Sequence, residues 1–431
     1  AGLSPRAKNV LDLLLMWNRQ LNRHLGIEEG MPAGEFKSAD APGAEMGKPG
    51  QEEIKPEIEQ IQDRFRELLF AAAEKGHVVL LVDALDRFEA TERAAYMTWL
   101  PTVMPGKVRM LCTAISGKEQ KAIEYHSGLF ARSIDVFTRE EAQETLTMLC
   151  RLEHKTLPAG VGRAILDRKR DDGLYAVSSP LWLSLAVHMM MAIDHDDFEK
   201  MRKLEGRGDE VIEAYLLSLA EGFSPLPGEL FLGLVDKAAS IFGPGFTHKL
   251  FNYIACSRNG LREGDLERLI PAGGDERWDA LQFANLRRWF RAHLRDTGEA
   301  LQWNLAHSIL RNSLIERLGE DAGNSCHQAI AAHLLTLPSV DGLRVSETMY
   351  HLMQAGDAKQ GLDYYTSDLT SEEISGATRV LAEAVAAEGS GIQWVGSMVH
   401  ATHNQDEKAW SLAPHFIYNL NDALTVEGRL E

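Results

Sequence analysis

Asp83 and Asp86 follow a run of five apolar residues, 78–82, and are the side chains best suited to chemistry. A short apolar run bounded by Gly76 and Asp83 predicts a buried parallel strand. The carboxyl ends of such strands line the ligand crevice of an open α/β sheet. There Asp83 can hold a hydrated magnesium ion on nucleotide phosphates, and Asp86 can orient or deprotonate the attacking water. The alternative is that Asp83 only caps the following turn and that Asp86 is solvated.

The segments around these aspartates alternate between predicted helix and predicted strand. The spacing of apolar residues predicts amphipathic helices over residues 7–25 and 54–75. Short apolar runs predict further strands over 108–113 and 134–137. Alternating helices and strands indicate an α/β layer with a mostly parallel sheet. We therefore expect an α/β domain that presents Asp83 at the carboxyl edge of its sheet.

Beyond residue 137 the pattern becomes almost entirely helical. Thr138 and Glu141 form a capping box at the start of a helix, and helical periodicity continues to about residue 245. Further helices are predicted over 247–258, 263–270, 281–291 and 308–318. Before the last of them, strands over 292–295 and 300–305 would form a hairpin around the turn 296–299. Helices followed by such a wing indicate a winged-helix unit, and the rest of the chain is again helical.

The segment 77–86 resembles the Walker B motif of STAND-class NTPases, a family of signalling ATPases. The resemblance is to the NACHT-like branch, which includes nephrocystin-3, telomerase protein component 1 and bacterial antiviral STAND proteins. Members often carry an acid directly after the second aspartate. Arg87 occupies that position here, with Glu89 nearby, which argues against rapid hydrolysis.

Three later segments resemble other motifs of this family. Residues 108–116 resemble the sensor 1 segment, which implies that Thr113 lies near the γ-phosphate; otherwise Thr113 is an ordinary β-branched strand residue. Residues 178–183 resemble the GxP-type segment, whose proline, here Pro180, packs against adenine. Proline is also favourable in the first turn of any helix. His307, just after the wing, matches a histidine that touches the β-phosphate of ADP in relatives, although a lone histidine is more often structural.

A P-loop of the form GxxxxGK[ST] does not occur in the sequence. In the family it lies upstream of segments that resemble residues 1–5. We therefore expect the chain to be a fragment whose P-loop and effector domain precede residue 1. A degenerate ATPase is the alternative.

Composition limits the kinds of partner. A net charge of −18 disfavours general nucleic-acid binding, which depends on neutralising phosphates. A basic stripe beside the wing is the best hint of DNA binding, but acids on the neighbouring helix would repel phosphate, and we expect the arginines to pair with acids within the chain. The stripe is Arg287, Arg288, Arg291 and Arg295, and the acids are Glu263, Asp265 and Glu267. No apolar run is long enough for a membrane span, and the spacing of the four cysteines disfavours structural zinc and disulfides, so a cytoplasmic location is expected.

Together these features predict a mostly α chain with four domains. They are the C-terminal part of a NACHT-like nucleotide-binding domain (1–137), a helical lid (138–245), a winged helix (246–320) and the start of a TPR-like helical sensor (321–431). The resemblance implies a switch that binds ATP or ADP with Mg²⁺ at Asp83, Asp86, Thr113, Pro180 and His307. It would oligomerise when the C-terminal region recognises a protein trigger, such as a phage protein, and would activate an N-terminal effector in antiviral innate immunity. The alternatives are a transcription regulator of STAND type and a non-catalytic scaffold.

Overall fold

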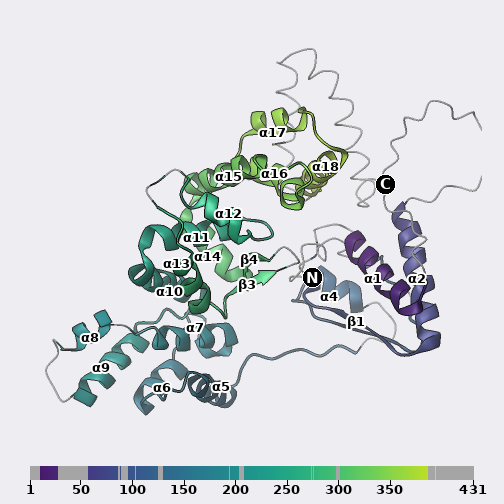
Figure 1. Cartoon of the computed structure of the whole chain (residues 1–431). Coiled ribbons are helices and arrows are strands. Elements are labelled where there is room, and N and C mark those ends of the chain that lie inside the picture. Colours follow the sequence, from purple (N-terminus) through teal and green to yellow (C-terminus); the bar gives the residue numbers. More distant parts are fainter. Residues whose placement is uncertain are drawn as a thin grey trace, which may run out of the picture. The chain divides into compact units, whose positions relative to one another are not determined.

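A computed structural model describes most of residues 10–386, together with Trp394 (Figure 1). Within that range it leaves out 28–56, 86–87, 89–95, 102, 125–129, 194, 203–207, 273, 275 and 298–300. The described residues divide between two compact units. One comes from segments 1–131 and 357–431, and the other is 132–356. The four predicted domains form a finer division, which remains a prediction.

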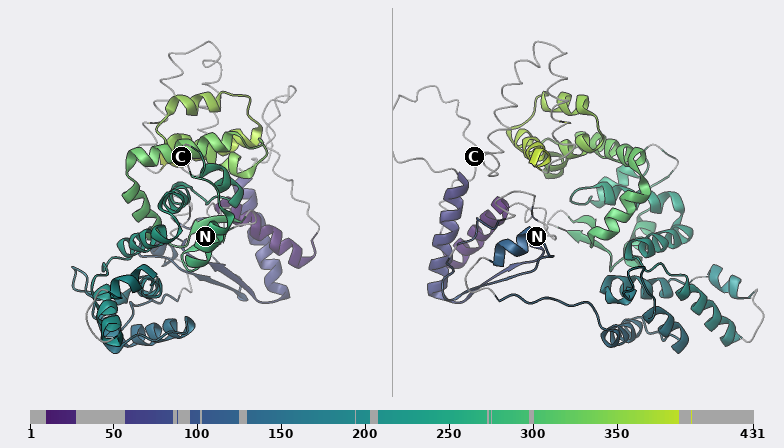
Figure 2. Two further views of the ribbon diagram at one scale, coloured as in Figure 1. Left: turned by 60° about the vertical axis from the view of Figure 1, so that its left-hand side comes forward. Right: turned by 180° about the vertical axis from the view of Figure 1, so that it is seen from behind.

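The first unit contains two long helices and a small parallel sheet. Its elements before residue 131 are α1 (Val10–Leu25), α2 (Glu57–Lys75), β1 (Val78–Val82), β2 (Val108–Cys112) and α4 (Lys118–Glu124). The strands pair in parallel, from Val78 opposite Val108 to Val82 opposite Cys112. Helices α1 and α2, purple to violet, lie side by side (Figures 1 and 2). The two predicted helices and the first two predicted strands are therefore confirmed.

The sheet is buried on one face only. Leu80 and Val82 belong to the same core as Phe65 of α2, which stacks on Trp17 of α1 with ring centroids 5.4 Å apart. The opposite face displays apolar side chains that are about two-thirds exposed: Val79 (61%), Leu81 (66%) and Leu111 (64%). The prediction that β1 is buried on both faces is therefore wrong, because helices cover only one side of this sheet within the described residues.

The prediction of a third strand over 134–137 is also wrong. These residues are extended but belong to no sheet, and Ile134 (89%) and Val136 (63%) are exposed. The backbone N–H of Phe137 donates instead to the carbonyl of Ser178, at 3.3 Å. An apolar run becomes a strand only when a neighbouring strand accepts its backbone hydrogen bonds.

The second unit begins with a helical region. Its elements are α5 (Arg139–Leu152), α6 (Ala159–Leu166), a 3-10 turn (Ala176–Ser178), α7 (Pro180–Met191), α8 (His195–Arg202), α9 (Gly208–Glu221) and α10 (Pro227–Phe242). The predicted capping box is confirmed at α5, where Thr138 Oγ1 accepts from the Glu141 N–H (3.2 Å) and Glu141 Oε2 accepts from the Thr138 N–H (2.9 Å). This pair of hydrogen bonds sets where α5 starts.

The same unit continues with the element order predicted for a winged helix. The elements are α11 (Pro244–Cys256), α12 (Glu263–Leu269), α13 (Ala280–Trp289), β3 (Leu294–Thr297), β4 (Gln302–Leu305) and α14 (Ser308–Leu318). Strands β3 and β4 pair antiparallel, as predicted. Leu261, between α11 and α12, forms a further antiparallel bridge to Trp303 of β4. The wing is thereby attached to the turn between the first two helices.

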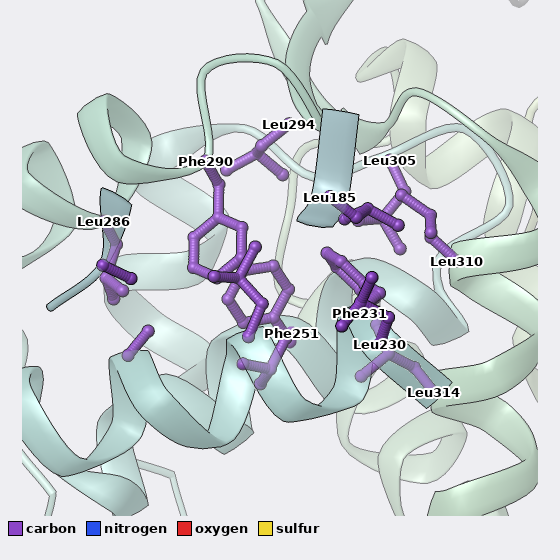
Figure 3. Close-up of a cluster of buried hydrophobic side chains, with 14 of the residues drawn as sticks. Leu185, Leu230, Phe231, Phe251, Leu286, Phe290, Leu294, Leu305, Leu310 and Leu314 are labelled. Carbon is purple, nitrogen blue, oxygen red and sulfur yellow. The ribbon is translucent and has the colours of Figure 1, made fainter. Parts of the chain in front are cut away.

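One hydrophobic core joins these helices. Phe231 of α10, Phe251 of α11 and Phe290 after α13 pack edge to face, with centroids 4.6 to 6.0 Å apart. Figure 3 shows leucines from α7, α13, β3, β4 and α14 around them. All are at most 9% exposed. The helices predicted for the lid and those predicted for the winged helix therefore share a single core.

The remaining helices are α15 (Glu320–Leu335), α16 (Gly342–Gln354), α17 (Ala358–Tyr365) and α18 (Ser371–Ala386). Helices α15 and α16 pack along each other, and α15 also contacts α11 and α12. The chain is mostly helical, as predicted. Within the described residues, no helix combines the length and hydrophobicity required to cross a membrane.

Gly260 provides a test of the bridge between Leu261 and the wing. Its φ is +92°, and a Cβ there would lie 2.6 Å from the carbonyl oxygen of Trp303. We expect Gly260→Ala to lower the free energy of unfolding of the second unit by about 2 kcal/mol or more, because left-handed strain adds to a backbone clash. Chemical denaturation measures the change.

Gly264→Ala is the matched control. It lies in α12, four residues away, and a Cβ there would meet nothing within 4 Å. Alanine should be neutral or stabilising by up to about 1 kcal/mol at such a helical position. Equal effects of the two substitutions would contradict the role assigned to Gly260.

Candidate functional site

Asp83 and Thr113 meet at the carboxyl edge of the parallel sheet. Asp83 directly follows β1 and Thr113 directly follows β2, and the Thr113 hydroxyl donates to Asp83 Oδ1 at 2.6 Å. The same hydroxyl accepts from the backbone N–H of Ala84 at 2.8 Å. Both side chains are exposed. The structure therefore joins two of the residues that the sequence singles out.

The backbone around this pair is fixed by the sheet and by a strained turn. The Thr113 N–H donates to the carbonyl of Val82 (3.1 Å), and the Leu85 N–H donates to the carbonyl of Thr113 (2.8 Å). Ala84, between Asp83 and Leu85, has a φ of +58°. A left-handed conformation costs a non-glycine residue about 1 kcal/mol, so the hydrogen bonds and the buried Leu85 must hold it in place.

An exposed carboxylate beside a hydroxyl suits a hydrated cation that also binds phosphates. Mg²⁺ in nucleotide sites is usually held by one or two protein oxygens, with water and phosphate completing its shell. Asp83 and Thr113 supply oxygens of this kind. Asp86, Arg87 and Glu89 lie outside the described residues. Among the residues that the structure describes, no group of three or more His, Cys, Asp or Glu side chains could hold a metal by itself.

Pro180 occupies the first position of α7, in the second unit. Ser179 caps this helix, since its Oγ accepts from the Trp182 N–H at 3.4 Å. Trp182 is fully buried, and its indole N–H donates to the carbonyl of Ser224 at 2.8 Å. Pro180 itself is exposed. This arrangement is that of an ordinary proline at a helix start, and the contact with adenine remains a prediction.

His307 occupies the N-cap position of α14, directly after the wing. Its side chain is exposed and makes no capping hydrogen bond to the helix. One turn further on, Arg311 donates to the carbonyls of Ala255 and Ser257 at the end of α11 and to the side chain of Asn304 in β4. The N-terminus of α14 is thereby fixed to α11 and to the wing. His307 thus has a well-defined backbone position, whereas its contact with phosphate remains a prediction.

A pair of stacked histidines near His307, one buried and one partly buried, was not predicted from the sequence. His188 of α7 stacks on His293, with centroids 5.6 Å apart and an interplanar angle of 18°. His293 is 1% exposed, and neither of its ring nitrogens has a hydrogen-bond partner. Burial lowers the pKa of His188 to about 4 and that of His293 to about 3. The charges of His188 and His307 lower the pKa of His293 further. No sequence signal marks this pair, because it arises from tertiary packing.

The basic stripe beside the wing is engaged within the chain. Arg287 lies 3.7 Å from Glu263 and stacks over the ring of Trp303. Arg291 pairs with Glu153 of α5 at 2.5 Å. The predicted pairing of these arginines with acids is confirmed for Arg287 and Arg291, which reduces the positive charge available to a nucleic acid.

Asp265 differs from its expected role as an acid that repels phosphate. It is 3% exposed and accepts from Arg262 Nε (2.7 Å) and from the His333 ring (2.9 Å). Arg262 also donates to Asp341 at 2.8 Å. These hydrogen bonds hold the pKa of Asp265 down at about 2 despite its burial, which by itself raises that pKa. Asp265 therefore ties α12 to α15 and does not face the surface.

Comparisons with known proteins identify one similar protein and no family. No protein-family model and no solved structure matches the chain. The chain is similar to a TPR repeat-containing protein of Dictyostelium discoideum, with 22% identity over 194 residues. The match covers 45% of this chain and 10% of that protein, so the chain spans about a tenth of its relative's length. This similarity agrees with a TPR-like helical region.

The stacked histidines His188 and His293 predict a loss of stability on acidification. Their pKa values in the folded chain, about 4 and about 3, lie below the usual 6.5, so the unfolded state binds more protons. Their contribution to the free energy of unfolding is complete above about pH 6.5. It declines as the pH falls towards their pKa values in the folded chain. Between pH 7 and pH 5, we expect the pair to lower the free energy of unfolding by about 4 kcal/mol, measured by denaturant titration.

His293→Leu should reduce this pH dependence by about half, whatever it does to absolute stability. His248→Gln is the control, since that histidine is only half-buried and lies 3.3 Å from Asp236. A His293→Leu chain with the same pH slope as the unchanged chain would contradict this explanation.

Proposed function

We propose that this chain is the core of a STAND-type switch that binds ATP or ADP with Mg²⁺ and oligomerises when a trigger is recognised. The observation that carries the proposal is the hydrogen-bonded pair Asp83–Thr113 at the carboxyl edge of the parallel strands β1 and β2. Nucleotide-binding α/β sheets place their ligands at this edge. The order of the resembling segments along the chain adds support.

Each residue of the pair has a distinct part in the proposed site. Asp83 accepts a hydrogen bond on one oxygen, and its carboxylate would hold the magnesium ion that neutralises the phosphates. The Thr113 hydroxyl orients that carboxylate and would lie near the γ-phosphate. Asp86 would act on the attacking water. Slow turnover suits a switch, in which nucleotide binding and exchange set the state.

The second unit would contribute Pro180 against the adenine and His307 on the β-phosphate of ADP. A neutral or protonated imidazole can donate a hydrogen bond to phosphate and lose it when domains rearrange. Such a contact stabilises the closed, ADP-bound state by about 1–3 kcal/mol. The ATP-bound form would oligomerise and activate an N-terminal effector, in a cytoplasmic antiviral or innate immune pathway. Those outputs rest on the family resemblance alone.

A helical scaffold without nucleotide chemistry is the second candidate. It is favoured by the packed helices α15 and α16 and by the similarity to a TPR repeat-containing protein. Arrays of helix pairs present extended surfaces to protein partners. The two candidates differ in one measurable property, the binding of nucleotide.

Asp83→Asn tests the nucleotide site. It should weaken magnesium-dependent ATP binding by the full-length protein at least about tenfold, or about 1.4 kcal/mol, because the neutral amide is a poor ligand for Mg²⁺. It should also abolish ATP-dependent assembly. Isothermal titration calorimetry with and without Mg²⁺ measures the first effect, and light scattering measures the second.

Glu74→Gln is the control, since Glu74 is an exposed acid of α2 in the same unit. Thr113→Ser should retain binding because it keeps the hydroxyl, whereas Thr113→Val should weaken it. Unchanged assembly in the Asp83→Asn protein would rule out the switch. A lack of nucleotide binding by the unmodified full-length protein would favour the scaffold.

His307→Ala tests the switch itself. We expect it to weaken ADP binding by about 5- to 150-fold and to raise assembly without a trigger, because the closed state loses a contact. Fluorescent ADP titration and the assembled fraction measure the two effects. His248→Ala should change neither. A His307→Ala protein that binds ADP normally and stays unassembled would remove His307 from the mechanism.

A further inference from the structure

Cys256 and Cys326 are far apart in the sequence but lie on two helices that pack together. Cys256 is the last residue of α11, and Cys326 lies in α15, which packs against α11. The two thiols lie close enough for each to shift the pKa of the other. Both are free thiols in the structure. The remaining cysteines, Cys112 and Cys150, lie in β2 and α5.

The two thiols differ in a way that suits redox chemistry. Cys256 is 3% exposed and belongs to the core, whereas Cys326 is only partly buried and lies at the edge of that core. The interaction between the two thiols lowers the pKa of Cys326, whereas the same interaction and burial raise the pKa of Cys256. Reactive cysteines combine thiolate character with access to solvent, and redox-sensing ones often adjoin a second thiol.

The surroundings of Cys256 are positively charged and rigid. Arg311 donates to the carbonyls of Ala255 and Ser257, the residues on either side of Cys256. Its charge lowers the pKa of Cys256 against the effect of burial. A cation at this place stabilises a thiolate on Cys256 when that thiol has to react. The same contacts fix the end of α11, so Cys256 stays close to α15.

We propose that Cys326 and Cys256 form a reversible disulfide in the presence of a peroxide, with Cys326 as the attacking thiol and Cys256 as the resolving thiol. The Cys326 thiolate attacks one oxygen of hydrogen peroxide, the O–O bond breaks, and sulfenic acid and hydroxide form. The Cys256 sulfur then attacks the Cys326 sulfur. The S–O bond breaks, and hydroxide takes the Cys256 proton to leave as water. Two thiols and one peroxide thus give one disulfide and two waters.

The disulfide would join α11 of the winged-helix region to the first helix of the α15–α16 pair. It encloses α12, α13, the wing and α14 in one covalent loop. A cross-link over such a long loop restricts the unfolded chain and stabilises the folded one. A thiol reductant reverses the bond by exchange. The oxidised chain therefore holds α15 against the winged helix more firmly than the reduced chain, whether or not nucleotide binds.

Peptide mapping tests the proposal directly on the whole chain. After treatment with hydrogen peroxide and blocking of free thiols, trypsin should release residues 250–258 joined to 318–344. The mass of this species equals that of the two peptides less two hydrogen atoms. The thermal unfolding midpoint of the oxidised chain should rise by a few degrees and return with a thiol reductant.

Cys326→Ser should abolish the linked peptide and the shift of the midpoint, and it leaves the buried Cys256 in place. Cys150→Ser is the matched control, since Cys150 is buried in α5 and burial raises its pKa. In Cys256→Ser, Cys326 should accumulate as sulfenic acid that a cyclic diketone reagent traps. Cross-links mainly to Cys112 or Cys150, or sulfinic acid on Cys326 without a disulfide, would overturn the proposal.

Discussion

The packing of Phe231, Phe251 and Phe290 is the interaction on which the second unit depends. These rings come from α10, α11 and the end of α13, and leucines of α7 and α14 complete the same core (Figure 3). Pro180 begins α7 and His307 precedes α14, so both candidate residues are carried by one hydrophobic body. Packed cores are dense and do not deform gradually. A nucleotide-dependent movement that separated the predicted lid from the predicted winged helix would have to break this core. Residues 132–136, which belong to no helix or strand, are a less costly place for rearrangement.

Buried polar groups fix the order of the remaining helices. Arg262 and His333 surround Asp265, and Glu347 accepts hydrogen bonds from Asn259 and from the backbone of Arg258. These groups join the turn after α11 and the start of α12 to α15 and α16. A buried charge that loses its partner is strongly destabilising, so such networks permit few alternative arrangements. The winged-helix region and the following helix pair therefore behave as a connected body.

The sequence predicted those features that depend on local signals. The capping box at Thr138, the antiparallel hairpin before α14 and the helix over 308–318 are confirmed, because caps and turns act within a few residues. The first strand of the hairpin, expected over 292–295, is Leu294–Thr297. The sequence also predicted Asp83 and Thr113 at the carboxyl ends of two parallel strands, whereas the hydrogen bond between them comes from the structure. The features that the sequence did not predict depend on which elements pack around a residue in the folded chain. Residues 134–137 have strand-like composition but no partner strand, Asp265 is buried by α15, and His188 meets His293 only when α7 packs on the winged helix.

The left-handed backbone of Ala84 supports the proposed site. A turn with φ of +58° is easier for glycine, so alanine there carries a cost of about 1 kcal/mol that the fold has to offset. The offset comes from the Ala84 N–H bond to Thr113 Oγ1, the same oxygen whose proton points to Asp83. The Thr113 hydroxyl thus donates its only proton to the carboxylate and accepts from the backbone, and one lone pair of its oxygen is left. A turn whose only role was to reverse the chain after β1 would not require a positive φ at Ala84. Nor would it require the exposed Asp83 carboxylate to be held in one orientation. Strain that fixes a reactive group is typical of binding sites, where it lowers the cost of ordering that group around a ligand.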